Sequence, residues 1–254
     1  GASGPGDRGF GGDLVSASEI LGPDGPLTKM IPEYEYRPQQ VAMAELIEQC
    51  ISDGQDTMIQ AGTGTGKSFG YLVPAILADK QTIVSTANKT LQAQLVGKDL
   101  PTLKKIFPEL AFCVAKGKGN YLCKHKLSKA KTAIPPAPGD GDIDTIFGWQ
   151  PEWDQYRVDD VCLRGKCPFI GACYYHTAKR QRQEANVIVC NHALLLQDMI
   201  HQAGILPIGA KILIVDEAHQ LEQYAVNAQS DELSTTSFTN DMVCFHDQGK
   251  EFMA

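Results

Sequence analysis

The hydrophobic positions of this chain alternate between short apolar runs and longer stretches with helical spacing. Five β-branched runs predict buried strands, namely Thr57–Gln60, Thr82–Ser85, Ala111–Val114, Val187–Cys190 and Ile212–Val215. From Pro38 to Ser52 the spacing predicts a helix with a broad apolar face made of Val41, Ala44, Leu46, Ile47 and Ile51. Because such strands alternate with helices, we expect an α/β fold built on a parallel sheet.

Two segments depart from this alternation. The first thirteen residues hold six glycines, which predicts a flexible leader over residues 1–20 and ordered structure from about Leu21. From Lys116 to Arg182 cysteines appear, together with a stretch rich in Pro, Gly and Asp. Since strand-like runs resume afterwards, we interpret 116–182 as an insertion into a domain formed by 21–115 and 183–224. Residues 225–254 predict no element.

The composition restricts the class of protein. With 254 residues, of which 43% are apolar and 21% charged, the chain has room for one or two globular domains. It has no signal peptide and no apolar run near the roughly 18 residues of a membrane helix, so we expect a cytoplasmic protein. Eight cysteines in such a protein favour a metal or cluster site over disulfides.

The net charge of −7 argues against a generally basic nucleic-acid binder, but the charge is unevenly distributed. The segment from Lys98 to Lys131 holds nine lysines against Asp99 and Glu109 and carries +7, so the rest of the chain carries −14. Such a strip is suited to a phosphate backbone and stacked bases, with Lys118, Tyr121, Lys124 and Lys126 as candidate DNA contacts. The alternative is an ordinary solvated helix face.

A glycine-rich motif, AGTGTGKS, occupies residues 61–68, between a predicted strand and a helical stretch at Phe69–Ala78. This context is typical of a P-loop, in which backbone N–H groups and a helix N-terminus bind phosphates. The candidate ATP-binding residues are Gly62, Thr63, Gly64, Thr65, Gly66, Lys67 and Ser68. We expect Lys67 to reach the β- and γ-phosphates and Ser68 to bind Mg²⁺.

A second motif, DEAH, follows the predicted strand at Ile212–Val215. Ligand-binding groups of α/β sheets lie at the carboxyl ends of strands, so this motif is placed to share a site with the P-loop. We expect Asp216 to hold Mg²⁺ and Glu217 to deprotonate the attacking water. His219 is a candidate link between the nucleotide site and another ligand, such as a bound strand.

Four cysteines fall within the predicted insertion, with Cys162, Cys167 and Cys173 close together and Cys123 earlier. Four thiolates suit a [4Fe–4S] cluster or a structural zinc ion. The spacing lacks the paired knuckles of most zinc sites, which favours iron–sulfur, although four reduced, unconnected cysteines remain an alternative. Of the other four, Cys113 and Cys190 lie in strand-like runs and are expected to be core residues.

Together these motifs resemble the DinG-like branch of superfamily 2 helicases, the bacterial relatives of XPD. The segment from Gly22 to Gln40 resembles the family's opening, which implies adenine contact by Gln40 and Arg37. The segment Ser85–Leu95 resembles the motif that touches the DNA backbone, which implies contacts from Thr86 and Asn88. The cysteine set matches the family's cluster ligands.

The resemblance implies a RecA-like motor domain with an inserted [4Fe–4S] domain, ATP hydrolysis, and 5′-to-3′ movement on single-stranded, forked or partly duplex DNA by a monomer. It further implies that 225–254 begins an arch domain and that a second motor domain is absent, so we expect this N-terminal portion to bind ATP with little turnover. Two alternatives stay open: a non-hydrolysing ATP- and DNA-binding iron–sulfur module, and a different P-loop ATPase with a structural zinc site.

Overall fold

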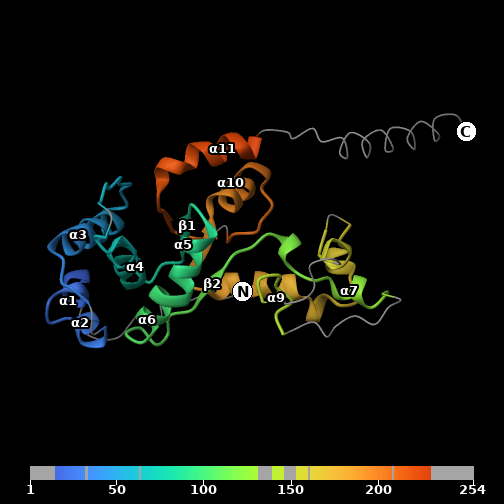
Figure 1. The fold of residues 1–254 in the computed structure, drawn as a ribbon, viewed down its shortest axis with the longest axis horizontal. Coiled ribbons are helices and arrows are strands. Elements are labelled where there is room, and N and C mark those ends of the chain that lie inside the picture. Colours follow the sequence, from blue (N-terminus) through green and yellow to red (C-terminus); the bar gives the residue numbers. More distant parts are fainter. Residues whose placement is uncertain are drawn as a thin grey trace, which may run out of the picture.

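A computed structural model describes residues 15–31, 34–62, 64–130, 139–145, 153–159, 161–207 and 209–229 of the chain. Figure 1 shows α1–α4 at one end of the molecule and α7 at the other. The elements before the predicted insertion are α1 (Ala17–Leu21), α2 (Pro26–Met30), α3 (Pro38–Asp53), α4 (Lys67–Leu77), β1 (Thr82–Thr86), α5 (Lys89–Gln94), the π-helix η1 (Leu95–Asp99), α6 (Leu100–Lys104) and β2 (Phe112–Val114).

The remaining elements complete the sheet and the segment that precedes its third strand. They are η2 (Lys118–Asn120), α7 (Lys124–Leu127), α8 (Trp153–Tyr156), η4 (Arg164–Lys166), η5 (Ile170–Ala172), α9 (Tyr174–Glu184), β3 (Val187–Asn191), α10 (His192–His201), β4 (Ile212–Val215), η6 (Ala218–Gln220) and α11 (Leu221–Gln229).

A four-stranded sheet with the order β2-β3-β1-β4 forms the centre of the fold, and all of its neighbouring pairs are parallel. Val84 of β1 lies opposite Val189 of β3 on one side and Ile214 of β4 on the other. The predicted α/β class and four of the five predicted strands are therefore confirmed. The parallel arrangement brings the carboxyl ends of β1, β3 and β4 to one edge of the sheet.

The fifth predicted strand, Thr57–Gln60, is wrong. Residues 55–62 contain neither helix nor strand, and the side chain of Met58 is 96% exposed. A strand forms only where a neighbouring strand accepts its backbone hydrogen bonds. Among the described residues β4 pairs with β1 alone, so no described strand extends the sheet next to the P-loop.

Two apolar clusters cover the two faces of the sheet, and successive residues of β3 alternate between them. Val187 and Val189 pack with α1, α3, α4 and α6, whereas Ile188 and Cys190 pack with Leu194 and Leu195 of α10. Burial raises the pKa of the Cys190 thiol to about 12, and that of Cys113 to about 11. Cys190 is a core residue, as predicted, whereas Cys113 is partly buried and packs against the same core.

Ordered structure begins before Leu21, so the predicted leader over 1–20 is too long. The Ser16 hydroxyl accepts a hydrogen bond from the Glu19 N–H, and the Glu19 carboxylate accepts one from the Ser16 N–H. This capping box starts α1, whose residues Ala17 and Ile20 are buried in the core. Residues 1–14 lie outside the described part of the chain.

The predicted helix from Pro38 to Ser52 is confirmed as α3, but its buried face is narrower than expected. Ala44 is fully buried, and Val41 and Ile47 pack against the core, whereas Leu46 is 48% exposed. The helix ends where Gly54 adopts a left-handed backbone conformation, which glycine tolerates without steric cost.

The segment that was interpreted as an insertion has a small apolar centre of its own. Leu122 and Trp153 are buried there against Ile143, Tyr156 and Tyr174. Its predicted end at residue 182 falls inside α9, so the helix end at Glu184 is the better boundary. Likewise, the boundary at 224 falls inside α11, and residues 230–254 lie outside the described part of the chain.

Arg182 fixes α9 to the sheet domain. Its side chain is fully buried, and its guanidinium donates to the carbonyl of Ile205 at 3.2 Å and to that of Lys116 at 3.5 Å. Because one buried guanidinium donates to the carbonyls of two different segments, it holds those segments together.

Among the helices that the structure describes, none has both the length and the apolar character of a membrane span.

Candidate nucleotide and nucleic-acid site

The glycine-rich loop leads directly into α4, which begins at Lys67. Gly64 and Gly66 have φ values of 76° and 75°, and a Cβ atom at Gly66 would collide with Nε2 of Gln40. Glycine is therefore required at Gly66 both by the backbone and by the close approach of Gln40. The hydroxyl of Thr65 donates to the carbonyl of Gly62 at 3.0 Å and closes the loop. Thr63 lies outside the described residues.

The side chain of Gln40 supports the backbone of the glycine-rich loop. Its side-chain N–H donates to the Gly66 carbonyl at 2.7 Å, and its side-chain oxygen accepts from the Tyr34 hydroxyl at 2.6 Å. Arg37, the other residue of the predicted adenine contact, is half-exposed beside the same loop and pairs with Glu35 at 3.4 Å. In this structure Gln40 supports the P-loop backbone, and its expected adenine contact stays a prediction.

The glycine-rich motif and the DEAH motif contact each other through an ion pair. The ammonium of Lys67 lies 2.9 Å from Oε1 of Glu217, and each side chain is 28% exposed. The hydrogen bond from Lys67 holds the pKa of the Glu217 carboxyl below its usual value. Glu217 has a φ of 54°, an uncommon left-handed conformation for a residue other than glycine. The expected proximity of the P-loop and the DEAH motif is therefore confirmed.

Asp216 follows β4 and is fixed by three hydrogen bonds. Its backbone N–H donates to the Ser85 carbonyl, its Oδ1 accepts from the Glu217 N–H at 3.0 Å, and its Oδ2 accepts from the Tyr71 hydroxyl at 3.2 Å. Burial, and next the charge of Asp216, raise the pKa of Tyr71, so this phenol stays a donor. Tyr71 lies one helical turn after Lys67, a position that the motif pattern does not mark.

Asp99 is a second carboxylate near the P-loop that sequence reasoning missed. It ends the π-helix η1, is 4% exposed, and has one oxygen without a partner. Burial raises its pKa, while a hydrogen bond with the Ser68 side chain opposes that effect. Through this hydrogen bond Asp99 contacts Ser68, the predicted Mg²⁺ ligand. Single-turn π-helices recur at functional sites, but the sequence carries no signal for one.

His192 lies beneath the DEAH motif and was also missed. Its Nδ1 is 2.8 Å from the Ser85 hydroxyl, and its ring packs edge-on to Tyr224 at 5.6 Å. Burial lowers its pKa, although the backbones of Glu217 and Asp216 act in the opposite direction. His192 therefore contacts β1, α11 and the DEAH backbone at once, while the predicted link, His219, is largely exposed and approaches Glu217 at 3.5 Å.

Two of the predicted DNA contacts are wrong, because their side chains are buried. Thr86 is fully buried, and its hydroxyl donates to the carbonyls of Asn88 and Cys190. Tyr121 is 4% exposed and packs against Tyr175, so its ring has no free face for a base. Asn88 is exposed and caps α5 by accepting from the Leu91 N–H.

The lysines near Cys123 make contacts within their own segment. Lys126 pairs with Asp159 at 2.6 Å, and the ammonium of Lys124 lies 4.4 Å from the ring centroid of Tyr174. Lys118 lies half-buried in η2. Part of the +7 charge of the segment from Lys98 to Lys131 is therefore engaged in contacts within the protein.

The four candidate cluster cysteines sit at the ends of short helices. Cys123 precedes α7, Cys162 precedes η4, Cys167 ends η4, and Cys173 separates η5 from α9. All four are free thiols. The Lys124–Tyr174 contact brings the residues after Cys123 and Cys173 together, and the rings of His125 and Phe169 lie 6.2 Å apart.

The cysteines do not form a site for a single ion. Among the described residues, no three His, Cys, Asp or Glu side chains converge closely enough to hold one metal ion. A four-iron cluster is wider than one ion, because each thiolate binds a different iron atom.

Comparisons with known proteins agree with this site. Residues 36–134 match the DEAD/DEAH box helicase family, and residues 155–238 match the DEAD_2 family. A solved structure titled truncated XPD has a TM-score of 0.45 and 13% identity, covers 71% of this chain and is itself covered to 53%; no conclusion rests on that likeness.

Curated relatives extend the match to most of this chain. Over 86% of this chain, the sequence is 35% identical to the ATP-dependent DNA helicase YoaA of Escherichia coli. Over 80% of this chain, it is 33% identical to the DinG helicase of the same species. A DinG helicase of Mycobacterium tuberculosis is 32% identical over 78%.

The two family models therefore match the segments that carry the P-loop and the DEAH motif, which the parallel sheet brings together. Over most of its length the chain is similar to the YoaA and DinG DNA helicases. It spans 34–38% of the length of these Escherichia coli relatives.

Proposed function

We propose that this chain is the ATP-binding half of a motor that separates DNA strands by moving 5′-to-3′ along single-stranded DNA as a monomer. The observation that carries the proposal is the contact of Lys67 with Glu217 at 2.9 Å, which joins the phosphate-binding motif to the acidic motif. Forked or partly duplex DNA is the proposed substrate of the whole protein, and ATP is the proposed ligand of this chain.

Lys67 has two anionic partners in this proposal. In the structure it binds Glu217, and on nucleotide binding the β- and γ-phosphates compete for the same ammonium. Once Lys67 turns to the phosphates, Glu217 loses the hydrogen bond that lowers its pKa. It then becomes a stronger acceptor for the proton of the attacking water, which is the role of a general base.

Mg²⁺ would be held by Ser68 and Asp216, and it would neutralise charge on the phosphates. These two residues fit that role, because a hydroxyl and a carboxylate are oxygen donors and each is already oriented by a neighbour. Tyr71 donates to Asp216, and Asp99 shares a hydrogen bond with Ser68. Tyr71 and Asp99 are therefore proposed positioning residues of the site.

The DNA path is proposed to follow the carboxyl end of β1, where Asn88 starts α5, and to continue toward the lysines near Cys123. His192 connects this region to the nucleotide site, since it contacts Ser85 of β1 and lies against the backbone of Asp216 and Glu217. Residue His192, rather than the exposed His219, is thus the better candidate for coupling DNA binding to the acidic motif.

A [4Fe–4S] cluster is proposed for Cys123, Cys162, Cys167 and Cys173. These free thiols lie at helix ends in one small unit, and thiolates are the ligands that such clusters require. The cluster would cross-link the segment from Lys116 to Glu184. We propose that residues 15–115 and 185–229 form the motor half around this segment and that an arch domain begins after α11.

ATP binding tests the proposal directly. Replacing Lys67 with alanine is expected to weaken binding of Mg–ATP about 10- to 100-fold, because a charge-assisted hydrogen bond to phosphate is lost. Lys80→Ala, which changes an exposed lysine after α4, is the matched control. Equal affinity of the Lys67→Ala variant and the control in a calorimetric titration would contradict the proposal.

A further inference from the structure

A cavity of about 190 Å³ lies where the predicted insertion leaves the sheet domain. Its walls come from α5, from the segment after β2, and from the start of α10. Its polar lining consists of Lys89, Gln92, Lys116, Asn120, Asn191 and Gln197, with Asp144 at its edge. Lys89 lines the cavity and directly follows Asn88, the exposed residue of the proposed DNA path.

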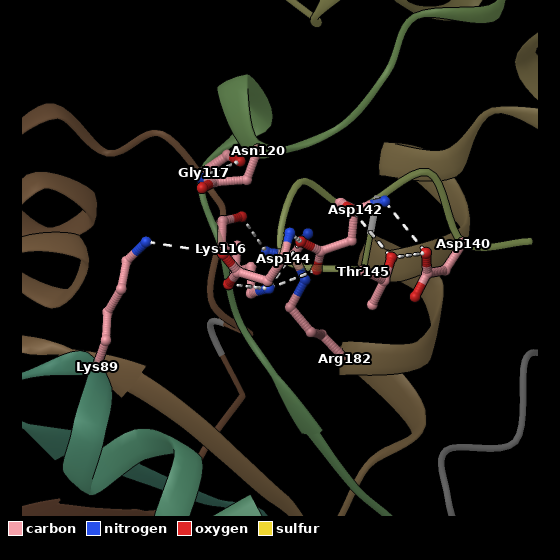
Figure 2. A network of polar contacts seen from close by, with 9 residues as sticks. All are labelled: Lys89, Lys116, Gly117, Asn120, Asp140, Asp142, Asp144, Thr145 and Arg182. Carbon is pink, nitrogen blue, oxygen red and sulfur yellow. Dashed lines mark hydrogen bonds and ion pairs between the residues drawn. The ribbon is translucent and has the colours of Figure 1, made fainter. Parts of the chain in front are cut away.

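Two carboxylates bind the lysine at the centre of this site, and Figure 2 shows them together. Lys116 donates to both oxygens of Asp142, at 2.7 and 2.6 Å, and to Asp144 at 2.7 Å. Burial lowers the pKa of Lys116, but the hydrogen bonds to the two aspartates outweigh it and raise the pKa. Asp142 alone is enough to neutralise the charge of Lys116, so Lys116 does not depend on Asp144 for its charge balance.

The two aspartates differ in burial. The side chains of Lys116 and Asp142 are 16% and 13% exposed, so they form a buried pair. Asp144 is 50% exposed and also faces Lys89, which is 72% exposed, at 3.9 Å. Asp144 is therefore the replaceable partner, and it occupies the position between two lysines where another anion would bind.

A carboxylate between two ammonium groups takes the place of a phosphate, because both present anionic oxygens to N–H donors. We infer that Lys89 and Lys116 form a binding site for one phosphate of single-stranded DNA and that Asp144 fills this site when DNA is absent. The inference rests on the proposed function for DNA binding and adds a residue that competes with the DNA. DNA then binds by displacing Asp144, while Asp142 stays on Lys116.

Removing the charge of Asp144 is expected to strengthen DNA binding. In Asp144→Asn a phosphate binds without first breaking the ion pairs of Asp144, so we expect an affinity about five-fold higher near 0.1 M salt, which is the value of about one phosphate contact. Anisotropy of a labelled oligothymidylate measures the affinity of Asp144→Asn over a salt series. The control, Asp24→Asn, removes an exposed carboxylate near α2. Equal gains in both variants would overturn the inference and indicate a general charge effect.

Lys89 supplies the second arm of the experiment. In the wild-type background Lys89→Gln should weaken binding about two-fold or less, because Asp144 already occupies the lysine. In the Asp144→Asn background the same change should cost about five-fold. An equal cost in both backgrounds would overturn the competition by Asp144. If no variant binds the oligothymidylate at all, the proposed function fails and the inference fails with it.

Discussion

The ammonium of Lys67 lies 2.9 Å from a carboxylate oxygen of Glu217, although 150 residues separate them in the chain. The contact exists because Glu217 follows the carboxyl end of β4, and Lys67 begins α4 at the same edge of the sheet. Among the described residues neither side chain has another ion-pair partner as close, so each is the main electrostatic neighbour of the other. We interpret this pair as the contact through which the two motifs form one site.

The cluster assignment is tested by Cys167→Ser. We expect anaerobically purified wild-type chain to hold about four iron atoms and matching sulfide, and the variant to lose most of both, because one of four thiolate ligands is removed. Cys50→Ser changes a cysteine of α3 outside the cluster segment and should leave iron unchanged. Unchanged iron in Cys167→Ser, or stoichiometric zinc in the wild type, would contradict the assignment.

Protonation of His192 should destabilise the fold. Because burial lowers its pKa, the neutral ring is favoured in the folded state. Its contribution to stability is therefore complete above the ordinary value of about 6.5 and is lost as the pH falls toward the folded-state value. We expect the melting temperature of the wild type to fall between pH 7 and pH 5 more steeply than that of His192→Gln. A similar slope in both proteins would contradict this account, and the exposed His219→Gln variant serves as the control.

Asp142 and Asp144 should differ in their effect on stability. Asp142→Asn removes a carboxylate that receives two hydrogen bonds from a buried lysine, and the expected cost is about 3 kcal/mol. Asp144→Asn should cost less than about 1 kcal/mol, because Asp144 is half-exposed and Lys116 keeps its other partner. Chemical unfolding of the two variants measures the difference. Equal losses would show that Asp144 is structural and would remove it as a replaceable anion.

Much of the sheet was predictable from sequence, because the β-branched runs at β1, β2, β3 and β4 mark strands by themselves, although only the central strands β1 and β3 are buried as predicted. Thr57–Gln60 has the same local pattern and forms no strand, since strand formation depends on a neighbour that the pattern cannot reveal. The same limit explains the overestimated burial of Leu46, because helical spacing gives a face and not the size of its partner.

The parts of the site that lie in short contiguous motifs, the P-loop and the DEAH motif, were predictable from the sequence. Residues that act through tertiary contact were not. Asp99 meets Ser68 only because η1 packs beside α4, and His192 meets Ser85 only because β3 pairs with β1. The reverse error occurred at Tyr121, where a residue type suited to stacking on bases turned out to be buried.

The central claim is that Lys67 and Glu217 share one ATP site, and the affinity of Glu217→Gln for Mg–ATP tests it most directly. The variant keeps the shape of the side chain but removes the charge that holds Lys67, so we predict an affinity about two- to five-fold higher than that of the wild type. In the Lys67→Ala background the same change should have no effect. An unchanged or weaker affinity in Glu217→Gln, with Lys67 intact, would contradict the account.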